Sequence, residues 1–294
     1  MDASDLKVFE AVARLGGMNR AAGELNTVQS NVTQRIKLLE EDLGTVLFDR
    51  HSRGVSLTAA GKRLMPYARD IRNTLEDARR AVIDDGTPQG PLHLGALETT
   101  AALRLNQHFT DFMAHHPNVD FTLRTGTTAE LIAMVLEREV EGAFACGPVD
   151  HPDLVSETVF NEELVILSAP GLARLDDILD KPDVRMIVLR AGCSYRQRME
   201  EVLTRRGVVN PRLLEFGTLE VIISAVAAGL GITMLPKTLI GRTWDAGRVA
   251  MHTLPRLEAA VETLYVQRRD NRASSGAMAF RDMVQRDRSA AAAE

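Results

Sequence analysis

Amide, hydroxyl and cationic side chains gather between residues 29 and 37, and together they have the chemistry to hydrogen-bond to the edges of DNA bases. The set consists of Gln29, Ser30, Asn31, Thr33, Gln34, Arg35 and Lys37. Few apolar residues lie among them, so this side of the segment does not predict a second core. We therefore expect these residues to face the major groove of a double helix.

An apolar stripe runs through the same segment at helical spacing. Val32, Ile36, Leu39 and Leu43 follow one another at intervals of four, three and four residues, so they share one face of a helix. That face has to be buried, which leaves the polar side chains on the opposite face. The spacing therefore predicts a recognition helix.

Two shorter helices are predicted before this one. Ala21, Ala22 and Leu25 give the second helix a small apolar surface for close packing, and Asn19 is placed to cap its start. The first helix has its own apolar face, which consists of Leu6, Phe9, Val12 and Ala13. The order of the three segments predicts a helix-turn-helix.

A basic turn follows the recognition helix. Leu47 and Phe48 form an apolar anchor, and residues 50–54 then turn tightly. This pattern is typical of a wing, which would place Arg50 or Arg53 beside phosphates or in the minor groove. The winged domain is predicted to cover residues 1–58. The alternative, a helical protein-interaction module with a solvated charged face, requires the order and spacing of all these elements to coincide by accident.

Residues 9–64 resemble the N-terminal domain of LysR-type transcriptional regulators across its whole length. One departure is Val28, where many members of the family have a Ser or Thr that caps the recognition helix, so that Thr27 or Gln29 has to serve as its start. The resemblance implies a regulator that binds double-stranded promoter DNA sequence-specifically. RNA polymerase is a second candidate partner.

The formal net charge of −5 over 294 residues argues against a protein coated in positive charge, so DNA affinity has to come from local patches. In one patch, Arg14, Arg20, Arg35 and Lys37 face only Glu24. In the other, residues 50–63 hold four basic and no acidic residues. The predicted electrostatic footprint is therefore small and focused.

A long amphipathic helix is predicted after the wing, with Thr58 as its cap. Its apolar positions alternate spacings of four and three, as in a coiled coil: Leu64, Ala68, Ile71, Leu75, Ala78 and Val82. The seam predicts a homodimer, although a helix docked on its own domain would show the same pattern. In LysR-type proteins this segment is a dimerising linker helix and the assembly is usually a homotetramer. Helix and hinge are assigned to residues 59–90.

From Leu92 onward, short apolar strands alternate with amphipathic helices, which is typical of an α/β domain. This part, residues 91–294, resembles the two-lobed effector domain of LysR-type regulators, which in turn resembles periplasmic solute-binding proteins. We expect lobe I to cover about 91–161 and 267–294, and lobe II about 162–266. The predicted fold class is α/β overall.

Hydroxyls and small residues follow three of the predicted strands, at helix starts. In two-lobed folds, ligands lie between the lobes, where helix N-termini favour anions. We expect a small polar or anionic metabolite to bind there, with Tyr195 or Arg196 nearby. The residues expected to bind it are Thr99, Thr100, Thr128, Cys193 and Ser194. The alternative is that each is merely a helix cap.

Catalysis is not predicted, because no histidine is placed to activate Cys193 and the histidines lack metal-ligand spacing. No cofactor or metal is expected. One branch of the family senses oxidants, but Cys146 and Cys193 lie far apart in sequence, in a buried-looking strand and at a turn, which disfavours a regulatory disulfide.

Two cysteines are too few for a disulfide framework, and the start of the chain lacks a signal-peptide pattern. The longest nearly apolar stretch, residues 221–236, is too short and too rich in glycine to span a membrane. A cytoplasmic location is therefore expected. A freestanding solute-binding protein with an added interaction domain is the remaining alternative.

Overall fold

The computed structural model describes residues 1–51, 54–172, 174–180, 183–189, 191–240, 246–270 and 273–291. The chain divides into two units, Met1–Asp85 and Gly86–Glu294, and each is described by itself. The first is a winged helix-turn-helix followed by a long helix, and the second mixes helices with strands. The predicted α/β fold class is confirmed. The domain and lobe bounds stay predictions.

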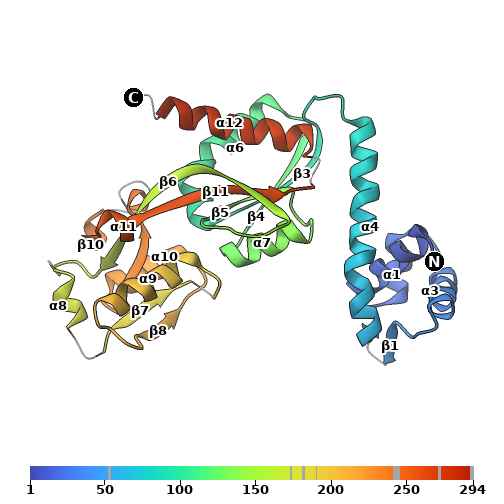
Figure 1. Ribbon diagram of the computed structural model, residues 1–294, viewed down its shortest axis with the longest axis horizontal. Coiled ribbons are helices and arrows are strands. Elements are labelled where there is room, and N and C mark those ends of the chain that lie inside the picture. The colour runs from blue at the N-terminus through green and yellow to red at the C-terminus, as the bar shows by residue number, and fades with distance from the viewer. Residues whose placement is uncertain are drawn as a thin grey trace. The chain divides into compact units, whose positions relative to one another are not determined.

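Helices dominate the N-terminal unit, which is drawn in blue and cyan in Figure 1. Its elements are α1 (Ala3–Leu15), α2 (Met18–Glu24), α3 (Gln29–Leu43), β1 (Phe48–His51), β2 (Gly54–Leu57) and α4 (Ala59–Ile83). The first three helices pack against one another, and α1 also packs against α4. These elements follow the predicted order.

Both ends of α1 are fixed by its sequence. Asp2 accepts a hydrogen bond from the amide of Asp5 at 2.9 Å, and the Asp5 carboxylate accepts one from the amide of Asp2 at 3.1 Å. A cap of this kind stabilises a helix by about 1 kcal/mol. Gly16 ends α1 in the left-handed region at a φ of 65°. The fixed helix buries Phe9, whose ring lies 5.2 Å from that of Phe48.

The predicted cap of α2 is wrong. The helix starts at Met18 with Gly17 as its N-cap, so Asn19 lies inside it. Gly16 is left-handed and Gly17 is extended, with a φ of −177°. The turn between α1 and α2 is therefore made by two glycines, and no side chain caps it.

The buried stripe of α3 is shorter than predicted. Val32, Ile36 and Leu39 are buried, as expected, but Leu43 is 36% exposed. Leu43 is the last helical residue, and Gly44 follows it with a left-handed backbone. The side chain at this end therefore lies beyond the core that the first three cover.

Strands and helices alternate in the C-terminal unit. The strands are β3 (Gly90–Ala96), β4 (Val119–Thr125), β5 (Gly142–Cys146), β6 (Leu154–Ser168), β7 (Arg185–Val188), β8 (Arg212–Glu215), β9 (Thr233–Pro236), β10 (Ala250–Thr253) and β11 (Ala260–Arg268). The α-helices are α5 (Glu98–Thr100), α6 (Asn106–His115), α7 (Thr128–Leu136), α8 (Asp176–Leu179), α9 (Ser194–Arg205), α10 (Leu219–Ala227), α11 (Arg256–Ala259) and α12 (Ser275–Ala291). A π-helix, η1 (Ala101–Leu105), joins α5 to α6. Two 3-10 helices, η2 (Lys237–Leu239) and η3 (Ala246–Arg248), lie between β9 and β10 in the chain.

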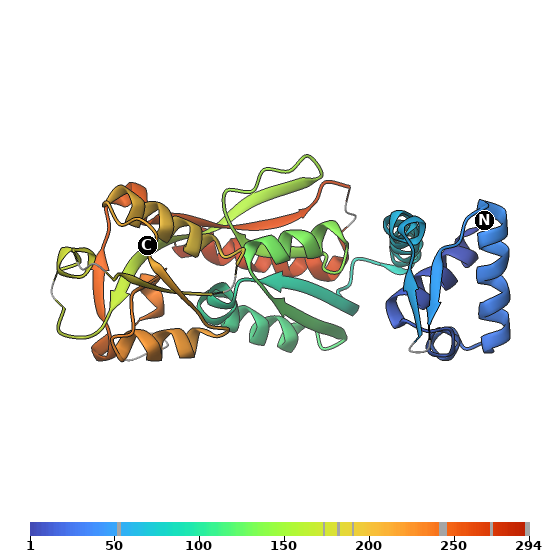
Figure 2. The same ribbon diagram turned by 90° about the horizontal axis from the view of Figure 1, so that it is seen from below.

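One long strand, β6, passes from lobe I into lobe II. The sheet order is β10-β6-β11-β5-β3-β4, with β9 also paired to β6, while β7 and β8 form a separate parallel pair. β6 pairs with β11 as far as Glu163 and with β9 from Leu164 onward. In lobe I, α6 and α12 cover one face of the sheet and α7 covers the other (Figures 1 and 2).

The apolar cores lie where these layers meet. In lobe I, Phe280 of α12 is buried with its ring 5.2 Å from that of Phe112 of α6. In lobe II, the buried Ile222 and Val226 of α10 belong to the same cluster as Met186 and Ile187 of β7. The helices are thereby held on the sheet, which fixes where each helix starts.

Candidate nucleic-acid interface and effector cleft

The predicted base-reading residues lie together on α3. Gln29, Ser30, Asn31, Gln34 and Lys37 are exposed, and Thr33 and Arg35 are half-buried. The opposite face of the helix is anchored in the core, so this face is presented by a rigid element. Amides and hydroxyls on one helix are the groups that read base edges in helix-turn-helix proteins.

Ion pairs neutralise part of the predicted positive patch. Arg14 pairs with Glu24 at 2.5 Å and with Glu10 at 3.2 Å, and Arg35 pairs with Asp5 at 3.2 Å. The prediction that these cations face only Glu24 is wrong. Asp5 and Glu10 both belong to α1. Glu10 lies one turn before Arg14 on the same helix, whereas the packing of α1 against α3 brings Asp5 within reach of Arg35. Arg35 is thus held by α1 at the edge of the reading face.

Other cations stay available at the surface. Lys37 lies 3.5 Å from Glu41, but both side chains are exposed, and such a pair is weak. Arg50, Lys62 and Arg63 are exposed, and in the part of the chain that the structure describes no ion pair engages them. Arg53, the other predicted wing residue, lies outside the described residues.

The wing is fastened to the recognition helix. The Glu40 carboxylate of α3 accepts hydrogen bonds from the amides of Leu47 at 2.7 Å and Phe48 at 3.2 Å. At the other strand, a Cβ on Gly54 would lie 2.5 Å from the carbonyl oxygen of Gly16, so only glycine fits this close approach. The strand that carries Arg50 is therefore positioned directly by α3.

The long helix α4 begins as predicted, because the Thr58 hydroxyl accepts a hydrogen bond from the amide of Gly61 at 3.1 Å. The first apolar positions of the seam pack against the core of the N-terminal unit, with Ala68 fully buried. The later ones do not: Ile71 is 37% exposed, Leu75 53% and Val82 88%. An apolar stripe is thus left uncovered on a single chain.

In the C-terminal unit, two helix starts from different lobes meet. Thr127 caps α7 in a capping box with Glu130, and Thr128 is the first helical residue. Cys193 is the N-cap of α9, and Ser194 is its first residue. The Ser194 hydroxyl donates a hydrogen bond of 3.0 Å to the Thr128 hydroxyl oxygen. The two lobes are therefore joined between their helix starts.

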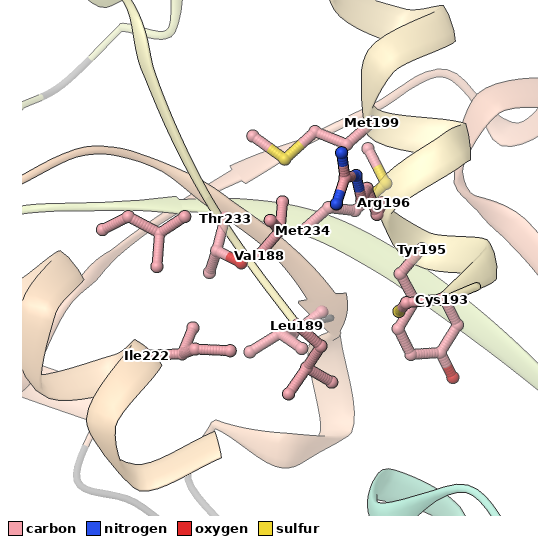
Figure 3. A pocket seen from close by; sticks show the side chains of 11 residues that line it. Val188, Leu189, Cys193, Tyr195, Arg196, Met199, Ile222, Thr233 and Met234 are labelled. Atoms are coloured by element: carbon pink, nitrogen blue, oxygen red, sulfur yellow. The ribbon is translucent and has the colours of Figure 1, made fainter. Parts of the chain in front are cut away.

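A second polar contact crosses between the lobes. The buried hydroxyl groups of Tyr195 and Thr99 lie 3.4 Å apart. Burial raises the pKa of Tyr195 well above its ordinary value, so the phenol stays protonated and can donate. Figure 3 shows its hydroxyl pointing away from the apolar side chains of Met199, Ile222 and Met234 in lobe II.

These groups line a cleft between the lobes. Its lining residues are Leu97, Glu98, Thr99, Thr125, Gly126, Thr127, Leu189, Cys193, Tyr195 and Gly217. The empty space within it is about 460 Å³, part of which is open to solvent. A ligand bound there would contact groups from both lobes.

The backbone of Gly192 lies close against lobe I. Its backbone is left-handed, with a φ of 90°, and a Cβ would lie 2.9 Å from the Thr127 hydroxyl oxygen and 3.1 Å from the Cβ of Ala129. Any side chain here would press on the start of α7. A bare residue at this position lets the lobes close.

The predicted effector residues are brought together in part. Thr99 and Cys193 line the cleft, and the Ser194–Thr128 hydrogen bond lies beside it. Thr100 is buried and does not belong to the lining. The sequence reasoning missed Thr125 and Gly217, which end β4 and precede α10. The same signal, a polar or small residue between a strand and a helix, could have found both.

Both cysteines are free. Burial raises the pKa of the Cys146 thiol to about 11 and also raises that of Cys193, against the opposing effect of the Tyr195 and Arg196 amides. Both are therefore thiols rather than thiolates at neutral pH. Because the thiolate is the reactive form, this environment disfavours oxidation.

Two family models match this chain. The model described as bacterial regulatory helix-turn-helix protein, lysR family, matches residues 3–62, and the LysR substrate binding domain matches residues 85–289. The chain belongs to the LysR family of transcriptional regulators. Its N-terminal unit is the DNA-binding part of the family and its C-terminal unit the effector-binding part.

This LysR-type regulator is similar along almost its whole length to proteins of Bacillus. It is 42% identical over 275 residues to the HTH-type transcriptional regulator GltR of Bacillus subtilis, covering 94% of this chain and 93% of that protein. It is 36% identical over 280 residues to CzcR of Bacillus cereus, covering 95% and 96%. These relatives are named as regulators, and this family member is likewise a transcriptional regulator and not an enzyme.

Solved full-length regulators share the fold. A variant of OxyR from Pseudomonas aeruginosa aligns with a TM-score of 0.70 at 18% identity, covering 98% of this chain and 94% of that one. CbnR in complex with its target DNA aligns with a TM-score of 0.66 at 22% identity, covering 98% and 100%. The predicted fold of this LysR-type regulator is thus confirmed over both units.

Two kinds of feature are absent from the described residues of this regulator. None of its helices there combines the length and apolar character that crossing a membrane requires. Nor do three or more His, Cys, Asp or Glu side chains gather there as metal ligands would.

Proposed function

We propose that a small polar or anionic metabolite binds between lobes I and II and changes how this regulator binds or activates its promoters. The observation that carries the proposal is the meeting of two helix starts across the cleft, joined by the Ser194–Thr128 hydrogen bond. Helix N-termini and hydroxyls favour anionic and polar groups. Thr99, Thr100, Thr128, Cys193 and Ser194 are the proposed effector-binding residues.

The cleft also sets a requirement on the ligand's chemistry. Glu98 lines it together with the hydroxyls of Thr99 and Thr127. A carboxylate repels a ligand that is anionic throughout, so a ligand that pairs its anionic group with a hydrogen-bond donor is favoured. Amino acids and hydroxy acids have this combination.

Coupling to DNA follows from the position of the cleft between the two lobes. A ligand that contacts both lobes shifts the protein toward the lobe arrangement that it binds more tightly, in proportion to its preference for that arrangement. In an assembled regulator, such a shift changes how the DNA-binding pairs are spaced. The direction, activation or repression, depends on the promoter.

We further propose that the exposed stripe of α4 pairs with that of a second copy and that two dimers form a homotetramer. Ile71, Leu75 and Val82 are the apolar residues left uncovered on it. Paired recognition helices then contact the half-sites of promoter DNA. RNA polymerase is a further proposed partner, the proposed location is the cytoplasm, and no cofactor is proposed besides the effector.

The effector part of the proposal is tested by thermal shift with amino acids, hydroxy acids, dicarboxylates and sugar phosphates. A compound at one hundred times its Kd stabilises the folded state by about 2.7 kcal/mol, a measurable rise in Tm. The positive compound is then titrated by calorimetry into the wild type, Thr99→Val and Thr204→Ala. Thr204 is a matched control, because its hydroxyl bonds the Glu200 carbonyl of its own helix.

We expect Thr99→Val to weaken binding about tenfold, the loss of roughly one hydrogen bond in a cleft, and Thr204→Ala to leave it unchanged. The same compound is expected to alter the mobility shift of promoter DNA. Equal affinity of all three proteins would show that the compound binds elsewhere.

A further inference from the structure

The recognition helix begins at an unusual residue. Val28 is the N-cap of α3, with an extended backbone at φ −92° and ψ 149°, and its side chain makes no hydrogen bond to the helix. Its branched apolar side chain is 65% exposed. A polar side chain is strongly preferred at this position because it bonds the free amides of the first turn. The start of α3 is therefore less stable than it would be with a polar N-cap residue.

The neighbours do not replace the missing cap. The Thr27 hydroxyl oxygen accepts a hydrogen bond of 2.9 Å from the Asn31 side-chain amide. Gln29 is already the first helical residue. The Val28 carbonyl accepts from the amides of Asn31 at 3.1 Å and Val32 at 3.3 Å, so only the backbone of Val28 serves the helix. The helix therefore starts at Gln29, one of the two starts expected from the sequence, and no side chain caps it.

Packing does not explain the valine either. Val32, one turn later, is 1% exposed and belongs to the core, whereas Val28 stays outside it. A single exposed apolar side chain is ordinary on a protein surface. Val28 differs because it occupies the position where a hydroxyl would stabilise the helix, at the end from which a recognition helix contacts base edges.

The chemistry of the major groove supplies a match for this side chain. Thymine alone among the bases presents a methyl group there, and aliphatic side chains recognise it by contact. We propose that Val28 is a specificity-determining residue whose methyl groups pack against the C5-methyl of a thymine in each DNA half-site. The exposed Gln29, Ser30 and Asn31 beside it supply hydrogen bonds to neighbouring positions.

Uracil interference tests the proposal directly, and it can be carried out before the operator sequence is known. DNA from the region upstream of the regulator's own gene is amplified with a low fraction of deoxyuridine, which removes single thymine methyls at random. Full-length protein is bound, bound and free DNA are separated, and uracils are mapped by glycosylase cleavage. Wild type is expected to lose about fourfold in affinity at one thymine in each half-site, the effect of about one buried methyl group.

The variant Val28→Ser removes both methyls and supplies a cap. We expect it to lose the interference at that thymine, to bind thymine and uracil DNA equally, and to melt at the same or a higher temperature than wild type. A loss of affinity without a loss of stability cannot come from misfolding. Val46→Ser is the matched control, because Val46 is also an exposed valine, at 59%, but follows α3. It is expected to keep the wild-type pattern.

Three results would overturn the proposal. Wild type could show no thymine methyl that matters, or Val28→Ser could keep the wild-type interference pattern. Third, Val28→Ser could lose affinity relative to wild type by the same factor on thymine DNA and on uracil DNA. That result would assign the side chain to the sugar-phosphate backbone instead.

Discussion

The hydroxyl of Ser194 at the start of α9 lies 3.0 Å from the hydroxyl of Thr128 at the start of α7, and it donates a hydrogen bond from lobe II to lobe I. Thr128 also accepts a hydrogen bond from the amide of Cys146 at 3.3 Å. The contact therefore links α9 of lobe II to both α7 and β5 of lobe I. It stands beside the cleft in which we propose that the effector binds.

Ser194→Ala removes this link without removing the bond from Cys146. We expect a loss of about 1 kcal/mol in the free energy of unfolding of the C-terminal unit, or roughly 2–4 °C in its Tm by calorimetry. Thr204→Ala, which removes a hydroxyl bound within α9, is expected to cost about half as much or less. If the two variants melt alike, the lobes are not held together by Ser194.

Gly192→Ala tests the close approach of the lobes. Backbone strain at a positive φ costs about 1 kcal/mol, and contact with Thr127 and Ala129 adds to it. Gly207→Ala isolates the strain, because Gly207 has a φ of 83° and nothing within 4 Å of a Cβ. We expect amide exchange at the start of α7 to speed up in Gly192→Ala only. Equal exchange in both variants would contradict this close contact.

On the DNA side, the variants fall into two classes. Alanine at Gln29, Asn31 or Thr33 is expected to relax sequence preference by about 1–3 kcal/mol per lost base contact. Arg50→Ala is expected to weaken binding to all sequences and to lower the slope of log K against log salt by about 1. Arg212→Ala is the control: it removes one positive charge from the C-terminal unit and should change neither the sequence preference nor the salt slope. If the variants on α3 and at Arg50 bound the promoter as wild type does, the reading face and the wing would be assigned wrongly.

The exposed stripe of α4 predicts a specific loss of assembly. Leu75→Glu places a charge where we expect an apolar contact between copies, and Leu75 is 53% exposed, so the fold of one chain should not suffer. Sedimentation velocity is expected to show a smaller species than wild type. Glu76→Lys, on the neighbouring outward position, should sediment like wild type. An unchanged size of Leu75→Glu would move the interface away from α4.

The raised pKa of the Cys146 thiol predicts that the folded protein is alkylated slowly at neutral pH. The pKa of Cys146 is raised to about 11, so the thiolate is scarce below that pH and alkylation by iodoacetamide is expected to be slow at about pH 7.5. In urea the thiol returns to its ordinary pKa of about 8.5, and alkylation at the same pH should be much faster. Mass spectrometry measures both rates. Fast modification of the folded protein, or a Cys146–Cys193 disulfide after mild peroxide, would restore the redox alternative.

Local spacing was enough to predict the helices and the wing of the DNA-binding unit. Val32, Ile36 and Leu39 lie within a few turns of one helix, so their burial follows from the sequence pattern alone. The Arg35–Asp5 ion pair does not follow from it, because it joins α3 to α1 between residues 30 positions apart. Counting charges by segment therefore placed Arg35 in a positive patch that is in fact partly neutralised. Partners that packing supplies from another helix cannot be read from a single segment.

The effector cleft could likewise be predicted only in part from the sequence. Helix starts after strands were visible in the sequence, and Thr99 and Cys193 indeed line the cleft. Their meeting depends on β6, which runs from Leu154 to Ser168 through both lobes. It also depends on β11, whose partners β5 and β6 lie far earlier in the chain. Which helix starts face each other is therefore decided by long-range pairing.

DNA recognition by this regulator is tested most directly by a salt-dependent mobility shift of the purified protein on the intergenic DNA next to its own gene, with a scrambled competitor. We expect retardation that survives the competitor and weakens steeply with salt, with a smaller salt slope for Arg50→Ala. An absence of specific retardation even at low salt would contradict it. The chain would then be acting as a ligand-binding protein whose N-terminal unit does not read DNA.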